Sequence, residues 1–273
     1  MSGKLYVVGT PIGNLSDISP RGIKTLCEVD FIAAEDTRVT AKLLNHFDIK
    51  KPLISYYEHN KREKGTVITD RILSGESCAI VTDAGMPCIS DPGEDLIREC
   101  HLLGIPVESV PGPTAFATAL AISGMDTGRF TFEGFLSVNK QSRKQHLEEL
   151  KNEKRTMIFY EAPHKLRNTL KDLYTFFGDR EIAIVKELTK IHETVLRTSL
   201  KQANEIFESE NPKGEYVLIL EGFRGEEKQP VTIEQAVKSA KELTEKGMSV
   251  NEAAKTVAAE TGFKKSDIYK SLL

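Results

Sequence analysis

The chain has 273 residues and a formal net charge of −3 at pH 7, with 40% apolar and 28% charged residues. This is the composition of a globular protein with a core, and the charge is not the strongly basic one of many nucleic-acid-binding proteins. No apolar run approaches the ~20 residues of a membrane helix, and the N-terminus lacks a signal-peptide pattern. The four cysteines form no Cys-x-x-Cys pair, which is typical of reduced thiols. We therefore expect a cytoplasmic protein with no membrane segment.

The first half of the chain alternates between apolar strand patterns and helix patterns. Strands are expected at residues 5–9, 31–34, 53–56, 78–82 and 107–110, and helices at 19–28, 39–47, 65–74, 94–103 and 114–123. Ser19 is the expected N-cap of the first helix, with Pro20 at the first helical position. Repeated strand–helix units with apolar strands predict a mostly parallel sheet covered by helices on both faces.

The second half predicts another α/β unit, in which strands more often follow one another. Strands are expected at residues 131–136, 157–160, 181–186 and 216–221, with a charged helix between the first two and further helices at 164–177 and 200–208. The fold class is therefore α/β with two α/β domains, which we expect at residues 1–123 and 124–223.

The last part of the chain has a different pattern. The charged segment 224–230 is an expected linker. Three short helices are expected at residues 232–246, 251–261 and 267–273, and Gly247 and Gly262 end the first two. This pattern is compatible with a plain helical appendage and with a helix-turn-helix-like module, which we expect at residues 230–273.

Glycine- and proline-rich loops follow three expected strands, at residues 9–15, 83–93 and 111–114. In parallel sheets, ligands bind beyond the carboxyl ends of the strands, and glycine lets the backbone approach a ligand. One such loop is compatible with a simple tight turn, but three favour a binding site. The chain lacks the Walker A, dinucleotide-binding and Gly-x-Ser-x-Gly patterns, which disfavours ATPase, NAD-dependent and serine hydrolase functions.

Polar residues cluster at expected strand ends, at residues 35–38, 160–164 and 186–193. Functional roles and roles as helix caps or ion pairs are equally compatible with this placement. His59, His164 and His192 have no second ligand at metal-binding spacing, so we expect no catalytic metal. The basic segments 38–64 and 139–155 indicate either a solvated surface or a nucleic-acid-binding patch.

Several of these motifs, in chain order between Leu5 and Glu221, resemble one known family. They are Val-Gly-Thr-Pro-Ile-Gly-Asn-Leu at 8–15, Glu-Asp-Thr-Arg at 35–38, Asp-Ala-Gly-Met-Pro through Ser-Asp-Pro-Gly at 83–93, Val-Pro-Gly-Pro at 110–113, Tyr-Glu-Ala-Pro-His at 160–164 and Glu-Leu-Thr-Lys at 187–190. They resemble the tetrapyrrole methylase family, and within it the bacterial branch that methylates the 2′-oxygen of a cytidine in small-subunit (16S) ribosomal RNA. Family members commonly have proline after Gly134-Phe135-Leu136, where this chain has Ser137.

The resemblance implies a tetrapyrrole-methylase-like fold, with S-adenosylmethionine bound in a cleft between two α/β domains, and a homodimer. Transferring the family's cofactor contacts to this sequence implies a role for Pro11, Ile12, Gly85, Met86, Ile89, Thr114, Ala115, Tyr160, Glu187 and Gly214. The implied partner is the small ribosomal subunit, with the target cytidine in the decoding region. We expect the basic residues Arg38, Lys140, Arg143 and Lys144 to contact RNA.

Methyl transfer to a hydroxyl group requires alignment of the reacting atoms and profits from a general base. The candidates for a base or an orienting charge are Asp36, Asp83, Lys186 and Glu187, with Glu193 as a further possibility, and the sequence does not choose among them. The alternatives are methylation of a tetrapyrrole carbon, as in the wider family, and RNA binding without catalysis. The basic segments and the helical module argue against the first alternative, and the glycine loops argue against the second.

Overall fold

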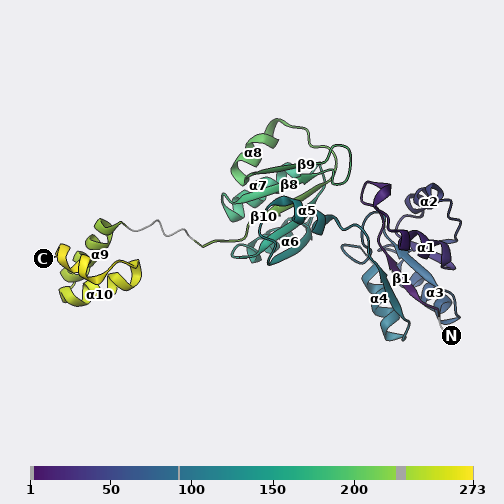
Figure 1. Ribbon diagram of the computed structural model, residues 1–273, viewed down its shortest axis with the longest axis horizontal. Helices are drawn as coiled ribbons and strands as arrows, with labels where there is room; N and C mark the ends of the chain where they lie inside the picture. Colours follow the sequence, from purple (N-terminus) through teal and green to yellow (C-terminus); the bar gives the residue numbers. More distant parts are fainter. Residues whose placement is uncertain (1–2, 92, 226–231, 273) are drawn as a thin grey trace. The chain divides into compact units, whose positions relative to one another are not determined.

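The computed structural model describes residues 3–91, 93–225 and 232–272. The chain divides into two compact units, Met1–Phe223 and Arg224–Leu273 (Figure 1). Most of the expected linker at 224–230, and residue 230 at the start of the expected helical module, lie outside the described residues. Within those described ranges, no helix combines the length and the apolar character that crossing a membrane requires.

The first sheet of the larger unit is parallel, with the strand order β3-β2-β4-β1-β5. Its strands are β1 (Leu5–Val8), β2 (Phe31–Ala34), β3 (Leu53–Ser55), β4 (Cys78–Val81) and β5 (Val107–Val110). Its helices are α1 (Pro20–Glu28), α2 (Thr37–His46), α3 (Lys61–Leu73) and α4 (Gly93–Leu102), and a short 3-10 helix, η1, spans Leu15–Asp17. Ser19 caps α1 as expected, because its hydroxyl accepts a hydrogen bond from the backbone N–H of Gly22.

Apolar cores cover both faces of this sheet. On one face, Ile68 of α3 and Leu96 of α4 pack against the strands, and on the other face Leu26 of α1 and Leu44 of α2 do so. Strands β2 and β4 are buried along their whole length. Because a strand covered on both faces has no solvent-facing side, its sequence is continuously apolar. The expected parallel sheet is confirmed.

The second sheet has the order β6-β7-β10-β8-β9, in which β6 and β7 are parallel and the other pairs are antiparallel. Its strands are β6 (Phe130–Phe135), β7 (Thr156–Glu161), β8 (Glu181–Lys186), β9 (Thr194–Ser199) and β10 (Tyr216–Leu220). One face is covered by α6 (Lys140–Glu149), α7 (Leu166–Phe177) and α8 (Leu200–Ser209), whose apolar side chains share a core with the strands.

Strand β9 does not follow from the sequence pattern, which predicts no strand between residues 186 and 200. Most side chains of Thr194–Ser199 are exposed or half-buried, so the segment has no apolar face that periodicity would detect. Its pairing with β8, from Glu181 opposite Ser199 to Lys186 opposite Thr194, makes it an edge strand. Strand formation here depends on the neighbouring strand more than on local preference.

Helix α5 (Ala115–Ser123) packs on the other face of the second sheet (Figure 1). Its Ala119 and Leu120 share a core with Ile158 of β7 and Val217 of β10. The boundary expected after residue 123 would assign α5 to the first domain, although α5 covers the sheet of the second. The chain crosses between the two sheets before α5, at the loop that follows β5.

The described part of the smaller unit, residues 232–272, folds into α9 (Ile233–Glu245), α10 (Val250–Thr261) and α11 (Lys265–Leu272). Thr232 and Gln235 form a capping box at α9, and Ser249 caps α10. Gly262 ends α10 in the left-handed conformation that glycine adopts without steric cost. The three helices bury a core of their own, formed by Ala236, Ala240, Ala253, Ala254, Val257 and Ile268.

Candidate functional site

A cavity of about 490 Å³ lies at the carboxyl ends of the strands of the first sheet. We call it the central cavity. The loops after β1, β2, β4 and β5 form one side of it, and the ends of β6, β7, β8 and β10 with their loops form the other. Its volume falls in the range of roughly 300–1,000 Å³ that is usual for small-molecule sites. The three glycine- and proline-rich loops therefore converge on one site, as the sequence predicts.

Close backbone contacts hold these loops together. The Thr10 backbone N–H donates to the Gly85 carbonyl at 2.9 Å, and the Gly85 N–H donates to the Thr10 carbonyl at 3.2 Å. A Cβ atom on Gly9 would lie 2.6 Å from the Cα atom of Gly112, so this approach requires glycine. Gly85 itself has φ +92°, which an L side chain rarely adopts. The glycines here bring the loops after β1, β4 and β5 into contact.

Two of the loops around the central cavity contain residues other than glycine in the left-handed region. Cys88 (φ 70°) and Ser90 (φ 65°) flank Ile89, and Glu187 (φ 53°) and Thr189 (φ 67°) flank Leu188. Ile89 and Leu188 both line the cavity. Such backbone conformations cost energy and concentrate at functional sites.

Four carboxylates line the central cavity: Glu35, Asp91, Glu161 and Glu215. The hydroxyl of Thr82 donates to Glu35 at 2.6 Å, and Glu161, which is buried, accepts from the Ala162 N–H and the Thr169 hydroxyl. Glu35 and Asp91 follow β2 and β4, Glu161 ends β7, and Glu215 precedes β10. Placement at strand ends is the signal in the sequence that could have identified them as site residues, but the candidate residues predicted from the sequence include none of the four.

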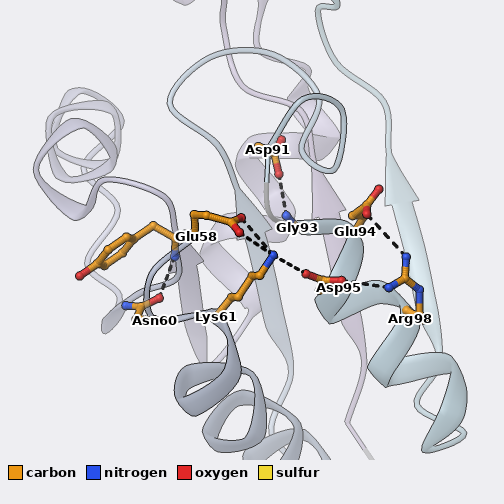
Figure 2. A network of polar contacts seen from close by, with 9 residues as sticks. Glu58, Asn60, Lys61, Asp91, Gly93, Glu94, Asp95 and Arg98 are labelled. Atoms are coloured by element: carbon orange, nitrogen blue, oxygen red, sulfur yellow. Dashed lines mark hydrogen bonds and ion pairs between the residues drawn. The ribbon is translucent and has the colours of Figure 1, made fainter. Parts of the chain in front are cut away.

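Asp91 differs from the other three carboxylates. Its Oδ1 accepts a hydrogen bond from the Gly93 N–H at 2.8 Å, at the first residue of α4, close to the ion pair between Lys61 and Asp95 (Figure 2). Its Oδ2 is buried and has no hydrogen-bond partner among the described residues. Burial raises the pKa of this carboxyl group. A buried acceptor without a partner is costly, so Oδ2 is suited to accept a hydrogen bond from a bound ligand.

The N-terminus of α5 also faces the central cavity through Thr114 and Ala115. The Tyr160 hydroxyl accepts a hydrogen bond from the Phe116 N–H at 3.0 Å, and burial raises the pKa of Tyr160. Since the first N–H groups of a helix carry partial positive charge, this end of the cavity favours an anionic group.

The cofactor positions that the resemblance implies fall into three groups. Ile12, Gly85, Met86, Ile89, Thr114, Ala115 and Tyr160 line the central cavity. Pro11 lines a smaller cavity, described below. Glu187 and Gly214 pack against each other: the Glu187 Oε1 accepts from the Glu215 N–H at 3.0 Å, and a Cβ atom on Gly214 would lie 2.4 Å from that oxygen. Glu187 and Gly214 thus shape the turn before β10, beside Leu188 and Glu215, which line the central cavity.

Lys190, which is not among the site residues predicted from the sequence, joins this turn to the loop after β8. Its Nζ lies 3.0 Å from Glu187 Oε1 and 2.9 Å from Glu215 Oε2. A Cβ atom on Gly13 would lie 2.7 Å from the Lys190 side chain, so the loop after β1 contacts this loop as well. The ammonium group of Lys190 lowers the pKa of Glu187.

The remaining base candidates occupy different environments. Asp36 caps α2 and pairs with Arg38, and hydrogen bonds from Arg38 lower its pKa to about 2. Asp83 lines a cavity of about 270 Å³, the side cavity, which shares Thr82 with the central cavity and also contains Pro11. Desolvation raises the pKa of Asp83, although its carboxylate accepts a hydrogen bond from the Asp36 N–H. Asp83 is therefore the stronger base of the two.

Lys186 and Glu193 complete the set of candidates. Lys186 is the last residue of β8, opposite Tyr216 of β10 and Thr194 of β9. Glu193 accepts a hydrogen bond from the Thr189 N–H at 2.6 Å and thereby stabilises the loop after β8. Neither side chain is among the described residues that line the central cavity.

Three of the expected RNA contacts lie together. Lys140, Arg143 and Lys144 line an open groove between α6 and α7, together with Lys165 and Lys171, and we call it the basic groove. Arg143 donates to Asp172 at 2.7 Å and to the Thr169 hydroxyl at 2.8 Å, whereas Lys140 and Lys144 are exposed. The fourth expected contact, Arg38, belongs to α2 and is paired with Asp36.

Known proteins similar to this chain were found by sequence. The family profile described as Tetrapyrrole (Corrin/Porphyrin) Methylases matches residues 4–204. A protein of Halalkalibacterium halodurans named "Ribosomal RNA small subunit methyltransferase I" is 46% identical over 271 residues, which cover 98% of this chain and 93% of that protein. The protein of the same name from Thermotoga maritima is 48% identical over 220 residues, which cover 81% of this chain and 99% of that protein.

Solved structures with the same fold were also found. Diphthine synthase superposes with a TM-score of 0.61 at 14% identity, covering 81% of this chain and 90% of that one. Uroporphyrin-III C-methyl transferase from Thermus thermophilus, complexed with S-adenyl homocysteine, superposes with a TM-score of 0.57 at 17% identity, covering 80% of this chain and 97% of that one. At these identities the likeness shows the fold, and the α/β architecture that the sequence predicts is confirmed.

Proposed function

Because the chain belongs to the tetrapyrrole (corrin/porphyrin) methylase family, we propose that it transfers a methyl group from S-adenosylmethionine to small-subunit (16S) ribosomal RNA. The acceptor is the ribose 2′-oxygen of a cytidine in the decoding region, as the family resemblance of the sequence motifs implies. Two relatives, 44% and 46% identical to this chain over 98% of its length, carry the name of a small-subunit ribosomal RNA methyltransferase. This name favours RNA over a tetrapyrrole as the substrate.

The observation that carries this proposal is that the central cavity lies beside a basic groove. The cavity residue Glu161 accepts a hydrogen bond from Thr169, which lines the groove. Lysines along a groove bind phosphates without reading the sequence of bases. A small-molecule site next to a phosphate-binding surface is what methyl transfer to RNA requires.

The residues of the central cavity fit the chemistry of S-adenosylmethionine. This molecule has a cationic sulfonium and ammonium group and an anionic carboxylate. Asp91, with its unpartnered Oδ2, and Glu35 would hold the cationic part or the hydroxyl groups of the cofactor. The N-terminus of α5 would hold the carboxylate. Gly85 leaves room because it has no side chain.

When bound, the cofactor supplies a methyl group that is already strongly electrophilic, so the protein mainly aligns the acceptor oxygen with it. Asp83 would act as the general base that accepts the proton of the acceptor hydroxyl group. Desolvation raises the pKa of Asp83 and makes it a better proton acceptor than Asp36. Asp83 lines the side cavity, and its neighbour Thr82 lines both cavities.

RNA binding, assembly and location follow from the same proposal. Lys140 and Lys144 contact RNA phosphates, and Arg143 holds the wall of the groove through Asp172 and Thr169. The two α/β domains hold the cofactor between them, with α5 belonging to the second, and the helical unit assists docking to the small ribosomal subunit. The chain acts as a homodimer, and a ribosomal RNA substrate implies a cytoplasmic location.

Calorimetry with S-adenosylmethionine, followed by transfer of a labelled methyl group to isolated small ribosomal subunits, tests the function. We expect cofactor binding and label in a single cytidine, detected as a 2′-O-methyl group by resistance to alkaline cleavage. Asp83→Asn should lower turnover by roughly 10²-fold, within the usual cost of losing a general base.

Two outcomes would contradict the proposal. Cofactor binding without methylation of either subunits or free ribosomal RNA would remove RNA as the substrate, and labelling of a tetrapyrrole would then support the alternative. Normal turnover by Asp83→Asn would remove this residue as the base.

A further inference from the structure

We propose that Phe135 is the surface on which a nucleobase of the RNA stacks, so that the adjoining ribose enters the central cavity. This inference rests on the proposed function, because it assumes an RNA substrate. Phe135 is the last residue of β6, lines the central cavity, and is 57% exposed. An exposed aromatic ring at the edge of a cavity is suited to stack on a planar ligand.

The local backbone places the ring there. The pairing of β6 with β7 shifts register between Phe132 and Gly134, and Gly134 has φ +62°. Such a bulge bends the strand and changes the direction of the following side chain. A Cβ atom on Gly134 would lie 3.5 Å from the Ser90 hydroxyl, so the bulge abuts the strained loop after β4. The bulge therefore brings Phe135 beside the residues that line the cavity from the first sheet.

Neighbouring aromatic side chains hold the Phe135 ring in position. Phe135 and Tyr160 meet edge to face with their centroids 5.5 Å apart, and Phe132 contacts Tyr160 at 4.9 Å. The Tyr160 hydroxyl is fixed by the Phe116 N–H. Because its neighbours hold it in place, Phe135 loses little conformational freedom when a base stacks on it.

The position of Phe135 relative to the basic groove indicates what stacks there. The residues that follow it, Ser137 and Val138, already line the groove, which continues with Lys140. Hydrogen bonds from Arg143 to Thr169 and from Thr169 to Glu161 connect the wall of the groove to the cavity. An RNA strand whose phosphates bind in the basic groove thus has its next nucleotide beside Phe135.

The RNA segment at this place must be single-stranded, with an unstacked base. Proteins recognise such bases by stacking them on aromatic side chains, and this contact tolerates different bases. We therefore expect Phe135 to position the nucleotide without selecting its identity. Base identity would be read by polar groups of the cavity.

The test compares Phe135→Ala and Phe135→Tyr with the wild-type protein. Phe130→Ala is the matched control, because Phe130 lies on the same strand, is 39% exposed, and is not among the described residues that line the central cavity. We expect Phe135→Ala to lower kcat/KM for small ribosomal subunits by roughly 5-fold or more, because one base loses its stacking contact. Phe135→Tyr and Phe130→Ala should stay within about 3-fold of wild type, and the cofactor Kd should not change in any variant.

A binding experiment separates this inference from the proposed function. A single-stranded RNA oligonucleotide that contains 2-aminopurine loses fluorescence when that base stacks, so wild type should quench it and Phe135→Ala should not. Failure of the wild type to methylate RNA would refute the function, whatever the quenching shows. Equal quenching by wild type and Phe135→Ala would refute the stacking role. A higher cofactor Kd for Phe135→Ala would also refute it, since Phe135 would then contact the cofactor. A change in the oligomeric state of Phe135→Ala with unaltered RNA binding would refute it as well, since Phe135 would then contact a second copy of the chain.

Discussion

Both carboxylate oxygens of Asp36 bind the guanidinium group of Arg38: Oδ1 accepts a hydrogen bond from Nε at 3.0 Å, and Oδ2 accepts one from Nη2 at 2.6 Å. The same Oδ1 accepts from the Arg38 backbone N–H at 2.8 Å and so caps α2. Glu153 and Arg155 repeat this arrangement before β7, away from the central cavity. In both pairs the carboxylate has its pKa lowered to about 2.

This relationship predicts that Asp36→Asn changes stability more than turnover. Asparagine retains the helix cap but loses the ion pair, so we expect the melting temperature to fall by a few degrees and turnover to stay near that of wild type. Glu153→Gln, the matched control, should behave alike. A drop of roughly 10²-fold in turnover for Asp36→Asn alone would instead identify Asp36 as the general base.

The stabilising effect of the Asp36–Arg38 pair depends on pH. The pKa of Asp36 is lowered from 3.8 to about 2, so the charged form is favoured by folding. Its stabilising effect is complete above the unfolded value near pH 4 and is lost as the pH falls toward 2. Thermal melting of wild type and Asp36→Asn should therefore differ at pH 5 and converge at about pH 2, and a constant difference would contradict this account.

The contact between Gly85 and Thr10 predicts that Gly85→Ala weakens cofactor binding by roughly 10-fold or more, equivalent to about 1.4 kcal/mol. A Cβ atom there would lie 3.4 Å from Ile12, and the backbone at φ +92° would be strained. Gly104→Ala is the control, because Gly104 also has a positive φ but a Cβ atom would meet nothing within 4 Å. Calorimetry should show a normal Kd for Gly104→Ala, whereas equal losses in both variants would attribute the effect to backbone strain alone.

The unpartnered Oδ2 of Asp91 predicts opposite effects on stability and binding. Burial raises the pKa of Asp91, so its charged form opposes folding, and the folded state gains stability as the pH falls through the raised value. Asp91→Asn should therefore leave the melting temperature at pH 7 unchanged or higher. Cofactor affinity should fall roughly 10-fold or more, the range for losing a charged hydrogen bond.

Asp95→Asn is the matched control for this prediction. Asp95 lies on α4 and pairs with Lys61 and Arg98, as Figure 2 shows, and these partners lower its pKa. Its loss should reduce the melting temperature without changing cofactor affinity. If Asp91→Asn binds the cofactor as wild type does, the ligand does not use Oδ2.

The exposed lysines of the basic groove predict a change in the salt dependence of RNA binding. Replacing both Lys140 and Lys144 by Ala should reduce the log–log slope of affinity against salt by about 0.7 per lost phosphate contact. The pair Lys24→Ala and Lys201→Ala, on exposed positions of α1 and α8, is the control. Arg143→Ala should also lower the melting temperature, because Asp172 would lose its partner. An unchanged slope for the Lys140 and Lys144 variant would place the RNA elsewhere.

The separate core of the helical unit predicts that a protein ending at Gly225 folds and binds the cofactor with normal affinity. The T. maritima relative lacks a counterpart for about a fifth of this chain, which is close to the length of Arg224–Leu273. We expect weaker binding to small ribosomal subunits, measured by cosedimentation. Methylation of subunits as efficient as that of the full chain would show that the unit does not assist docking.

Much of the local structure is predictable from the sequence because its causes are local. Ser19, Thr232 and Ser249 cap helices through their own side chains, and the apolar runs of β2 and β4 follow from burial on both faces. The family resemblance is confirmed as well, since it depends on loop motifs that are continuous in the chain.

Other features depend on residues that are far apart in the chain. Strand β9 exists because β8 offers it a partner, and α5 covers the second sheet because Ala119 and Leu120 find their core there. The chemical role of each carboxylate also depends on residues that are far apart in the chain. Asp36 is paired, Asp83 is desolvated, and Asp91 keeps an oxygen without a partner. All three are aspartates after a strand, and only the packing around each one determines its charge, its hydrogen bonds and therefore its chemistry.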